Sequence, residues 1–498
     1  MAPKDSMKAR ARISSPAPPK PQASVKAEAK DSGADTSTEW LGHAVTLVDM
    51  LGVVGLVTLC PLMCNVVAFL TNAPQLQRGG EAPLAGLPAA AEAAGGWLAL
   101  GKEALLFPGT GTWEATYFLL GFNALALLLF VLLPGEKKCG PVTSRGHTPE
   151  YTDNAVAHCF VFSAVFILCS NGLGPGYSLG LFDLGVMYDA FPGMVGCLNI
   201  FGLLFCAFLY VKGLTYPSCP DSGSSGNGIL FDYYWGTDLY PRVFGIDVKQ
   251  FVNCRFSMTF WQLAGVSFAY RSYTMHGALD PAIVLCTLSQ YLYLVKFYIW
   301  EIGYMRSIDI IVDRAGFYET WGCLVWVPSV YTLHTRILVR SPATCSFAES
   351  FIIFAIGLLG VGLNFWADNQ RQIFREMKGK CKIWGRPAAS IEAKYNLLNE
   401  KTGKKEPRTT QLLASGWWGV ARHSQYLFEL MAAWSWGFLG AGGFACPNGV
   451  FPLFYAFYLT LLLVHRERRD HDKCAAKYGK AWDKYCELVP YRILPLVY

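Results

Sequence analysis

The chain alternates between long apolar runs and short polar breaks from about residue 44 to residue 464. A run of roughly 17–25 apolar residues is long enough to cross the hydrocarbon core of a bilayer as a helix. Several of these runs are interrupted by Gly, Pro or a single charge. We therefore expect an all-α, polytopic membrane protein. The pattern predicts about ten spans, at 44–70, 115–133, 155–171, 192–213, 256–270, 282–300, 317–338, 348–366, 426–445 and 448–464.

The polar segments divide the chain into a tail and a single membrane domain. Residues 1–40 are rich in Lys, Ala, Pro and Ser, which predicts a disordered cytosolic tail. Residues 41–498 form the expected membrane domain, with a Gly/Ala/Pro-rich loop over 72–112. The first apolar run begins only at Ala44, so no cleavable signal peptide is predicted. Most of the polar chemistry lies in 367–498, where we expect the cofactor-binding part.

Composition and charge support a membrane protein and narrow its partners. Of 498 residues, 53% are hydrophobic and only 16% are charged, which is too apolar for a soluble domain. Basic residues are massed after the eighth and the last apolar runs, so the positive-inside rule places the C-terminal third in the cytosol. The 16 cysteines lack zinc-type spacing, which predicts no metal site. No basic, aromatic soluble surface is present to predict a nucleic-acid partner.

Arg371 and Arg375 stand four positions apart in a polar segment that follows the eighth run. On a helix this spacing places both guanidinium groups on one face. Two such groups suit a phosphate or a diphosphate, because each can form paired hydrogen bonds to its oxygens. The alternative is a cytosolic cap that binds only lipid headgroups or water.

Two further segments combine aromatic and polar residues at the membrane edge. The segment from Leu412 to Tyr426 is either an interfacial aromatic belt or a stacking surface for a flat ring. After the last run, five residues fall on or near one face if the segment is helical. They are either part of a solvated juxtamembrane helix or a binding site for a polar ligand. These five residues are Asp470, Cys474, Lys477, Tyr478 and Tyr485.

Polar residues inside the predicted spans suggest a functional site, because burying them in a bilayer is costly. They are Lys296, Glu301, Glu319, Glu429, Tyr291 and Tyr293. A structural pair of Lys296 with Glu301 is one interpretation, although five positions separate them. The other interpretation is a proton source or a substrate contact in a buried pocket.

Two long segments of the chain resemble the signature sequences of the membrane sterol reductases. One runs from Leu463 to Gly479, and the other runs from Gly228 to Arg242. The resemblance covers the chain from about residue 44 to its end. Three shorter pieces also agree: Arg306 to Ile310, Val325 to Pro328 and Val489 to Pro495.

This resemblance implies a multi-pass enzyme of the endoplasmic reticulum membrane that reduces a sterol ring double bond with NADPH. Such a reduction needs a proton and a hydride, and Tyr293 is the first candidate for the proton donor, with Asp470 second. Its implied partners are the sterol, membrane lipid and other enzymes of sterol biosynthesis. Matching motif positions place the NADPH contacts on Arg371, Arg375, Leu413, Trp418, Gln425, Tyr426, Asp470, Cys474, Ala475, Ala476, Lys477, Tyr478 and Tyr485.

Within the family, Ile383 to Pro387 and Trp418 to His423 resemble the Δ7-sterol (7-dehydrocholesterol) reductases. Tyr240, Lys296 and Cys323 differ from the usual family residues, and all three lie in the half expected to bind substrate. A Δ14 reductase therefore stays an alternative. So do a non-catalytic sterol-binding membrane protein and a methyltransferase of the isoprenylcysteine type, which would bind S-adenosylmethionine.

Overall fold

The computed structural model describes residues 45–73, 76, 84–107, 109, 111–143, 145–399 and 404–498. The predicted tail, residues 1–40, lies outside the described residues. The helices are α1 (Leu47–Asn72), α2 (Leu87–Ala93), α3 (Trp97–Leu106), α4 (Trp113–Leu132), α5 (Ala155–Cys169), α6 (Val186–Asp189), α7 (Phe191–Thr215), α8 (Ile229–Trp235), η3 (Gln250–Ser257), α9 (Met258–His276), α10 (Pro281–Ile299), α11 (Glu301–Tyr304), α12 (Ile308–Ile311), η4 (Phe317–Tyr331), α13 (Leu333–Ile337), α14 (Phe347–Glu376), α15 (Trp417–Val420), α16 (Ser424–Gly440), η5 (Phe451–Leu453), α17 (Phe454–Tyr478) and α18 (Lys480–Leu488).

The helices lie where the membrane spans were predicted, but only some of the described ones are long and apolar enough to cross a membrane. Every predicted span overlaps a helix. Among the described residues, five helices are both long and apolar enough to cross a membrane, namely α1, α4, α7, α10 and α14. Helix α5 is apolar but has only 15 residues. A count of ten spans therefore stays a prediction.

The chain is mostly helical, but it is not free of β-structure as the all-α prediction implied. The described residues form four two-stranded antiparallel sheets. The strands are β1 (Glu136–Cys139), β2 (Glu150–Asp153), β3 (Arg242–Val243), β4 (Ile246–Asp247), β5 (Lys382–Ile383), β6 (Arg386–Pro387), β7 (Ser390–Asn399) and β8 (Lys404–Leu413). The predicted loop over 72–112 contains the short helices α2 and α3.

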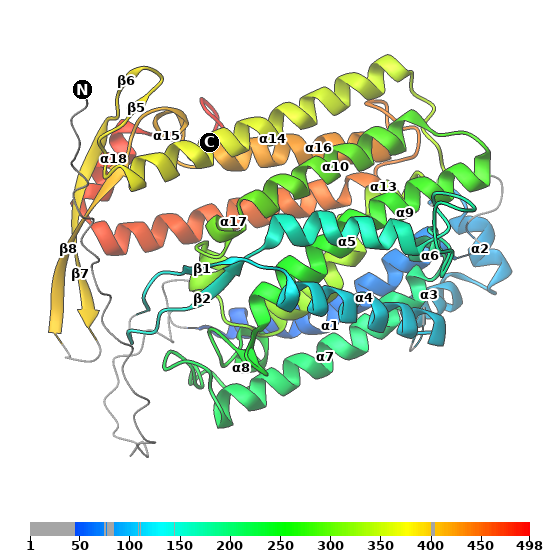
Figure 1. Cartoon of the computed structure of the whole chain (residues 1–498), viewed down its shortest axis with the longest axis horizontal. Helices are drawn as coiled ribbons and strands as arrows, with labels where there is room; N and C mark the ends of the chain where they lie inside the picture. The colour runs from blue at the N-terminus through cyan, green and yellow to red at the C-terminus, as the bar shows by residue number, and fades with distance from the viewer. Residues whose placement is uncertain are drawn as a thin grey trace, which may run out of the picture. The chain divides into compact units, whose positions relative to one another are not determined.

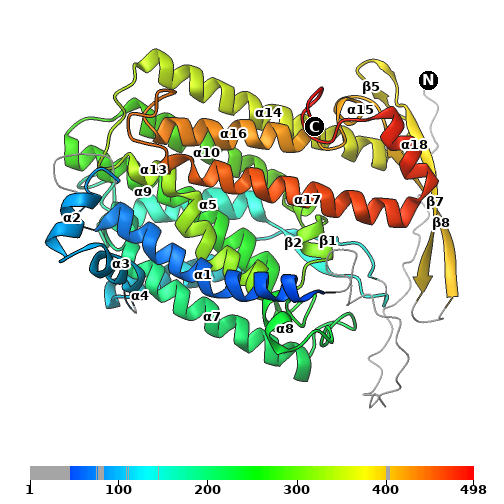
Figure 2. The same cartoon turned by 180° about the vertical axis from the view of Figure 1, so that it is seen from behind.

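The longest sheet is the β7–β8 hairpin, which pairs Ser390 with Leu413 and continues to Asn399 with Lys404. Apolar and polar residues alternate along the first half of β7, the pattern of a strand with two different faces. This hairpin lies with β5, β6, α15 and α18 at one end of the long helices α14 and α17 (Figures 1 and 2). The polar segment of the sequence is therefore a cap on the helical domain.

Helices α10, α14, α16 and α17 lie side by side and form the part of the domain that carries the polar C-terminal residues (Figures 1 and 2). The contact of α14 with α16 is close because glycines face α16. A Cβ added at Gly357 would lie 2.9 Å from Cβ of Ser435, and one at Gly360 would lie 2.7 Å from the Phe428 carbonyl oxygen. Small residues let two helices approach in a membrane, where packing drives their association.

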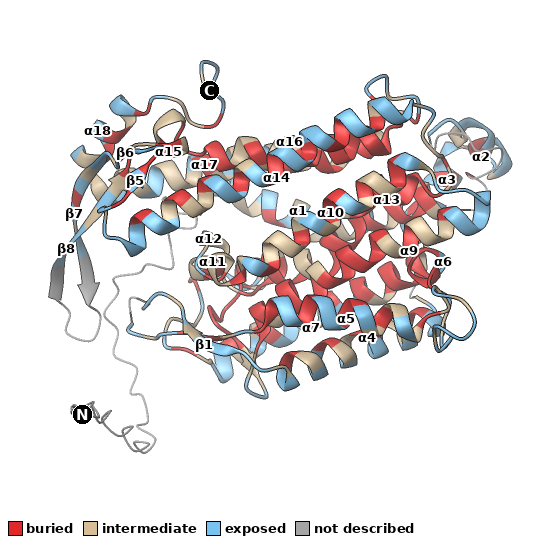
Figure 3. Ribbon diagram, turned by 45° about the horizontal axis from the view of Figure 1, so that its top comes forward, coloured by how far each residue is buried: buried red, intermediate tan, exposed pale blue. Residues whose placement is uncertain are grey.

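Burial follows the expected division between a packed interior and a lipid-facing surface. Buried residues cover much of α9, α10 and α13 (Figure 3). By contrast, large apolar side chains are exposed on α4, α7 and α14, as a protein surrounded by acyl chains requires. Examples are Leu120, Leu128, Phe201, Leu204 and Phe351.

A buried ion pair inside this interior corrects one interpretation of the sequence. Glu301 pairs with Arg255 of the π-helix η3, and it also accepts a hydrogen bond from Gln250 Nε2 at 2.6 Å. The ammonium of Lys296 donates instead to Asn364 Oδ1. The pair of Lys296 with Glu301 is therefore wrong, because the carboxylate turns toward η3 and the ammonium toward α14.

We expect Gly360→Ala to lower the free energy of unfolding, since the added methyl group overlaps the α16 backbone. Overpacking of this kind costs about 1–3 kcal/mol. Gly362→Ala is the matched control, because its Cβ meets no atom within 4 Å. The midpoint of thermal unfolding in detergent measures both variants. Equal midpoints for the two would contradict the close contact of α14 with α16.

Candidate functional site

The first part of the site forms where α14, α15 and α18 meet. The guanidinium carbon of Arg371 on α14 lies 4.6 Å from the centre of the Trp418 ring. Trp418 donates its indole N–H to the Ala367 carbonyl at 2.8 Å. Its own carbonyl accepts from the Tyr485 hydroxyl at 3.1 Å. Arg375 follows one helical turn after Arg371 and is exposed. The helix expected around both arginines is present.

Charged residues of α17 also lie near Arg371. Burial and then the Asp470 carboxylate raise the pKa of the Cys474 thiol to about 12, while Arg371 and Lys477 act in the opposite direction. Burial also raises the pKa of Tyr485, and Arg371 again opposes it. The guanidinium of Arg371 is therefore near residues of both α17 and α18.

A residue that the sequence did not single out borders this site. Tyr395, on strand β7, lies with its ring centre 4.3 Å from Lys477 Nζ. The same Nζ lies 5.1 Å from the Tyr478 ring, and the two tyrosine rings meet edge to face at 5.7 Å. Burial lowers the pKa of Lys477, and Arg375 lowers it further. The alternating pattern of β7 predicts a strand with Tyr395 on its less polar face, but no local signal pairs Tyr395 with Lys477.

A neutral histidine stands between α16 and α17. His423 Nε2 lies 3.4 Å from Asp470 Oδ2, and burial lowers the pKa of His423 to about 4 although Asp470 opposes this. At neutral pH the contact is therefore between a carboxylate and an uncharged ring. The ring stacks on Tyr426 at 4.8 Å. Among the described residues, His423 Nε2 and the buried Oε1 of Gln425 have no hydrogen-bond partner.

The second part of the site lies one turn further along α16. The hydroxyl of Tyr293, on α10, donates to Glu429 Oε1 at 2.6 Å. The Tyr293 ring meets the Trp436 ring edge to face at 5.2 Å. Lys296 Nζ lies 5.8 Å from the centre of the Tyr293 ring. Glu429 follows Tyr426 by three positions, a rise of about 4.5 Å along the helix. Helix α16 thus brings the two parts of the site together.

Two salt bridges fix the position of α17, and neither was predicted. Arg466 pairs with Asp309 at 2.9 Å, and Arg469 pairs with Asp313 at 2.9 Å. Burial raises the pKa of Asp313, while Arg469 is the main opposing influence. Arg466, Arg469 and Asp309 lie in segments that resemble the family signatures and Asp313 does not, and each pairing spans more than a hundred residues and leaves no local pattern.

The remaining predicted site residues differ in burial and in the elements that carry them. Helix α17 ends at Tyr478 and Gly479 has a positive φ of 49°, so Tyr485 belongs to a separate helix and not to one continuous face. Leu413 is buried in a small apolar cluster with Trp418. Ala475 packs against the cluster of Tyr485, whereas Ala476 is exposed. The described part of the chain holds no cluster of three His, Cys, Asp or Glu residues that could bind a metal ion.

Comparison with known sequences decides the family. The sequence model of the ergosterol biosynthesis ERG4/ERG24 family matches residues 77–498. The chain belongs to this family. The match includes every residue of the site described above. The membership that the signatures around Gly228 and Leu463 implied is confirmed.

Relatives in the ERG4/ERG24 family carry two different names. The 7-dehydrocholesterol reductase of Arabidopsis thaliana is 40% identical over 378 residues, which cover 76% of this chain and 83% of the relative. The protein of the same name from Xenopus laevis is 31% identical over 396 residues, covering 77% and 80%. A Δ14-sterol reductase of Methylotuvimicrobium alcaliphilum is 33% identical over 388 residues, covering 78% and 84%. Both kinds of sterol reductase are therefore similar to this chain.

Proposed function

We propose that the protein is a sterol reductase of the endoplasmic reticulum membrane. It reduces the Δ7 double bond of a 5,7-diene sterol with NADPH, an oxidoreduction of a CH–CH group. The observation that carries this proposal is the arrangement along α16. Tyr426, which stacks on His423 beside Asp470, lies one helical turn from Glu429, the partner of the Tyr293 hydroxyl. The names of the relatives supply the sterol and the type of reaction.

The side chains present suit a reduced nicotinamide dinucleotide. Arg371 and Arg375 offer paired donors for phosphate oxygens. The unpartnered acceptor Oε1 of Gln425 suits a donor such as a ribose hydroxyl or a carboxamide N–H. Asp470 adds a carboxylate beside them. When bound, the cofactor supplies the hydride.

The residues of the second part supply and position the proton. Tyr293 holds it at its hydroxyl oxygen, in a 2.6 Å hydrogen bond to Glu429 Oε1 that the proton leaves when it moves to the sterol. The ammonium of Lys296 stabilises the phenolate that remains once the proton has moved to the alkene carbon. Asp470 contacts His423 and Cys474, and no interaction joins it to Tyr293 within the described residues. We therefore assign Asp470 a role in holding the cofactor.

The position of the double bond rests on the relatives. Identity is 40% with the plant 7-dehydrocholesterol reductase and 33% with the bacterial Δ14 reductase, over similar lengths. A Δ14 reductase is therefore the second candidate function. Both reactions need the same hydride and the same proton donor, so the geometry of the site serves either.

The two candidates differ in the sterol that they consume. Purified protein with NADPH should remove the conjugated ultraviolet absorbance of a 5,7-diene sterol and leave that of an 8,14-diene sterol unchanged. Boiled protein and reactions without NADPH are the controls. Loss of the 8,14-diene absorbance alone would establish the Δ14 reaction instead.

Arg371→Ala combined with Arg375→Ala should raise the Kd for NADPH about tenfold or more, because each charged hydrogen bond to phosphate contributes about 1.5–3 kcal/mol. Fluorescence titration of the cofactor measures the change. Lys480→Ala with Lys484→Ala is the matched control, since it removes two exposed cations at the same spacing from α18. A double arginine variant with the parental Kd contradicts the phosphate assignment.

Tyr293→Phe should lower kcat about 100-fold or more while leaving the Kd for NADPH unchanged, because only the proton donor is removed. Tyr291→Phe, on the same helix, removes a hydroxyl that bonds Ser163 at 3.4 Å and serves as the control. Single-turnover kinetics with a 5,7-diene sterol separate binding from chemistry. Parental turnover in the Tyr293→Phe variant places the proton donor elsewhere.

A further inference from the structure

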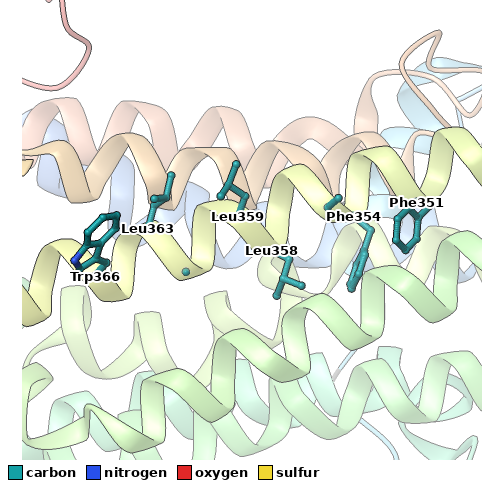
Figure 4. Close-up of a pocket in the computed structure, with 8 residues that line it drawn as sticks. Phe351, Phe354, Leu358, Leu359, Leu363 and Trp366 are labelled. Atoms are coloured by element: carbon teal, nitrogen blue, oxygen red, sulfur yellow. The ribbon is translucent and has the colours of Figure 1, made fainter.

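A shallow hollow runs along the outward face of α14, away from the site described above. Every residue that lines it belongs to α14, and the labelled side chains are all apolar (Figure 4). From Phe351 to Trp366 the helix rises by about 22 Å, more than the roughly 15 Å depth of one leaflet of the hydrocarbon core. The hollow is therefore long enough for a lipid acyl chain. Its lining is Phe351, Phe354, Ala355, Leu358, Leu359, Gly362, Leu363 and Trp366.

Three tryptophans meet at one end of this hollow. Trp366 lies 5.6 Å from Trp417 and 6.3 Å from Trp384, and the last two lie 5.3 Å apart, all measured between ring centres. Trp384 forms the turn between β5 and β6, and 51% of its surface is exposed. Tryptophan is enriched at the level of the headgroups in membrane proteins. The β5–β6 hairpin therefore marks the boundary between membrane and cytosol at this end of α14.

The segment around this hairpin carries only positive charge. Lys378, Lys380, Lys382 and Arg386 lie between residues 377 and 391, and this stretch contains no Asp or Glu. The side chains of Lys382 and Arg386 are exposed, and no acidic partner is found for them in the described part of the chain. Clusters of Lys and Arg directly cytosolic of a membrane helix attract anionic lipids, at about 1 kcal/mol for each cation.

The same corner has hydrogen-bond donors without acceptors. Gln370 follows Trp366 by one helical turn and accepts the Trp417 backbone N–H at 2.9 Å. Among the described residues, its buried Nε2 and the buried indole N–H of Trp417 have no partner. Both of these atoms are buried, so the exposed Lys382 and Arg386 are the donors that the acceptor oxygens of a headgroup phosphate can reach.

We propose that the hollow on α14 and the β5–β6 hairpin together bind one anionic phospholipid of the cytosolic leaflet. One acyl chain lies along the hollow from Phe351 to Trp366, and the headgroup phosphate lies beside Lys382 and Arg386. A second copy of this chain is disfavoured, because two such basic segments repel each other. A sterol lacks the phosphate that these cations recognise. The site includes none of the residues proposed for NADPH or for proton transfer.

Native mass spectrometry of the full chain in detergent tests the headgroup. Dioleoyl phosphatidylserine should bind at least tenfold more tightly than dioleoyl phosphatidylcholine. Lys382→Ala with Arg386→Ala should weaken phosphatidylserine binding about 30-fold, the effect of removing two cations. Lys480→Ala with Lys484→Ala, which removes the same charge from α18, should leave the affinity unchanged. Equal affinities for the two lipids, or equal losses in the two variants, would overturn the proposal.

The chain-length dependence tests the hollow. Dihexanoyl phosphatidylserine should bind at least tenfold more weakly than the dioleoyl lipid. Gly362→Phe should remove this difference, because its side chain enters the hollow from a position with no neighbour within 4 Å. Leu359→Trp narrows the same hollow if the first variant does not fold. Displacement of the lipid by equimolar inorganic phosphate would show that the basic residues bind free phosphate. A dimer that persists without lipid would show that a second copy of the chain covers the hollow. Either result would overturn the proposal.

Discussion

The geometry of the site depends on the contact between α14 and α16. Gly357 and Gly360 let the helices approach until a single amide can join them. Asn364 donates to the Gln425 carbonyl at 2.9 Å and accepts from Lys296, so it connects α14, α16 and α10. Since α14 carries the arginines, α16 and its N-cap carry His423 to Glu429, and α10 carries Tyr293, this contact sets how far Arg371 and Arg375 lie from the Tyr293 hydroxyl. A change in the spacing of α14 and α16 would separate the two parts of the site.

The residues that the sequence placed correctly belong to segments with a local pattern. Arg371 and Arg375 stand at i and i+4, and the helix that this spacing assumes is present. The apolar runs likewise fall on helices, because a long run of apolar side chains has few alternatives to a buried or lipid-facing helix. Where the local pattern was weaker, the prediction was wrong. Helical periodicity was extended across Gly479, although its positive φ ends α17 and begins a second helix.

The parts that the sequence did not predict are pairs of distant residues. Tyr293 and Glu429 are 136 positions apart, and Arg469 and Asp313 are 156 positions apart. Tyr293, Glu429 and Arg469 were visible as a phenol or charge in an apolar or signature segment, but only the packing of α10 on α16 and of α17 on the 308–313 segment selects their partners. The same limit explains the wrong pair of Lys296 with Glu301. Proximity in sequence favoured it, and the fold assigned each residue a more distant partner.

The three positions that differ from the family pattern do not lie equally close to Tyr293. Tyr240 is buried in a separate cluster with Tyr151, where Lys249 approaches its ring to 5.5 Å, and this cluster excludes Tyr293. Lys296 contacts Asn364 and lies over the Tyr293 ring, and Cys323 is half-buried on η4 against the same core as Tyr293. If Tyr293 is the proton donor, as we propose, a difference in the bond that is reduced acts through residues near it. Lys296 satisfies that condition, whereas Tyr240 belongs to a separate cluster.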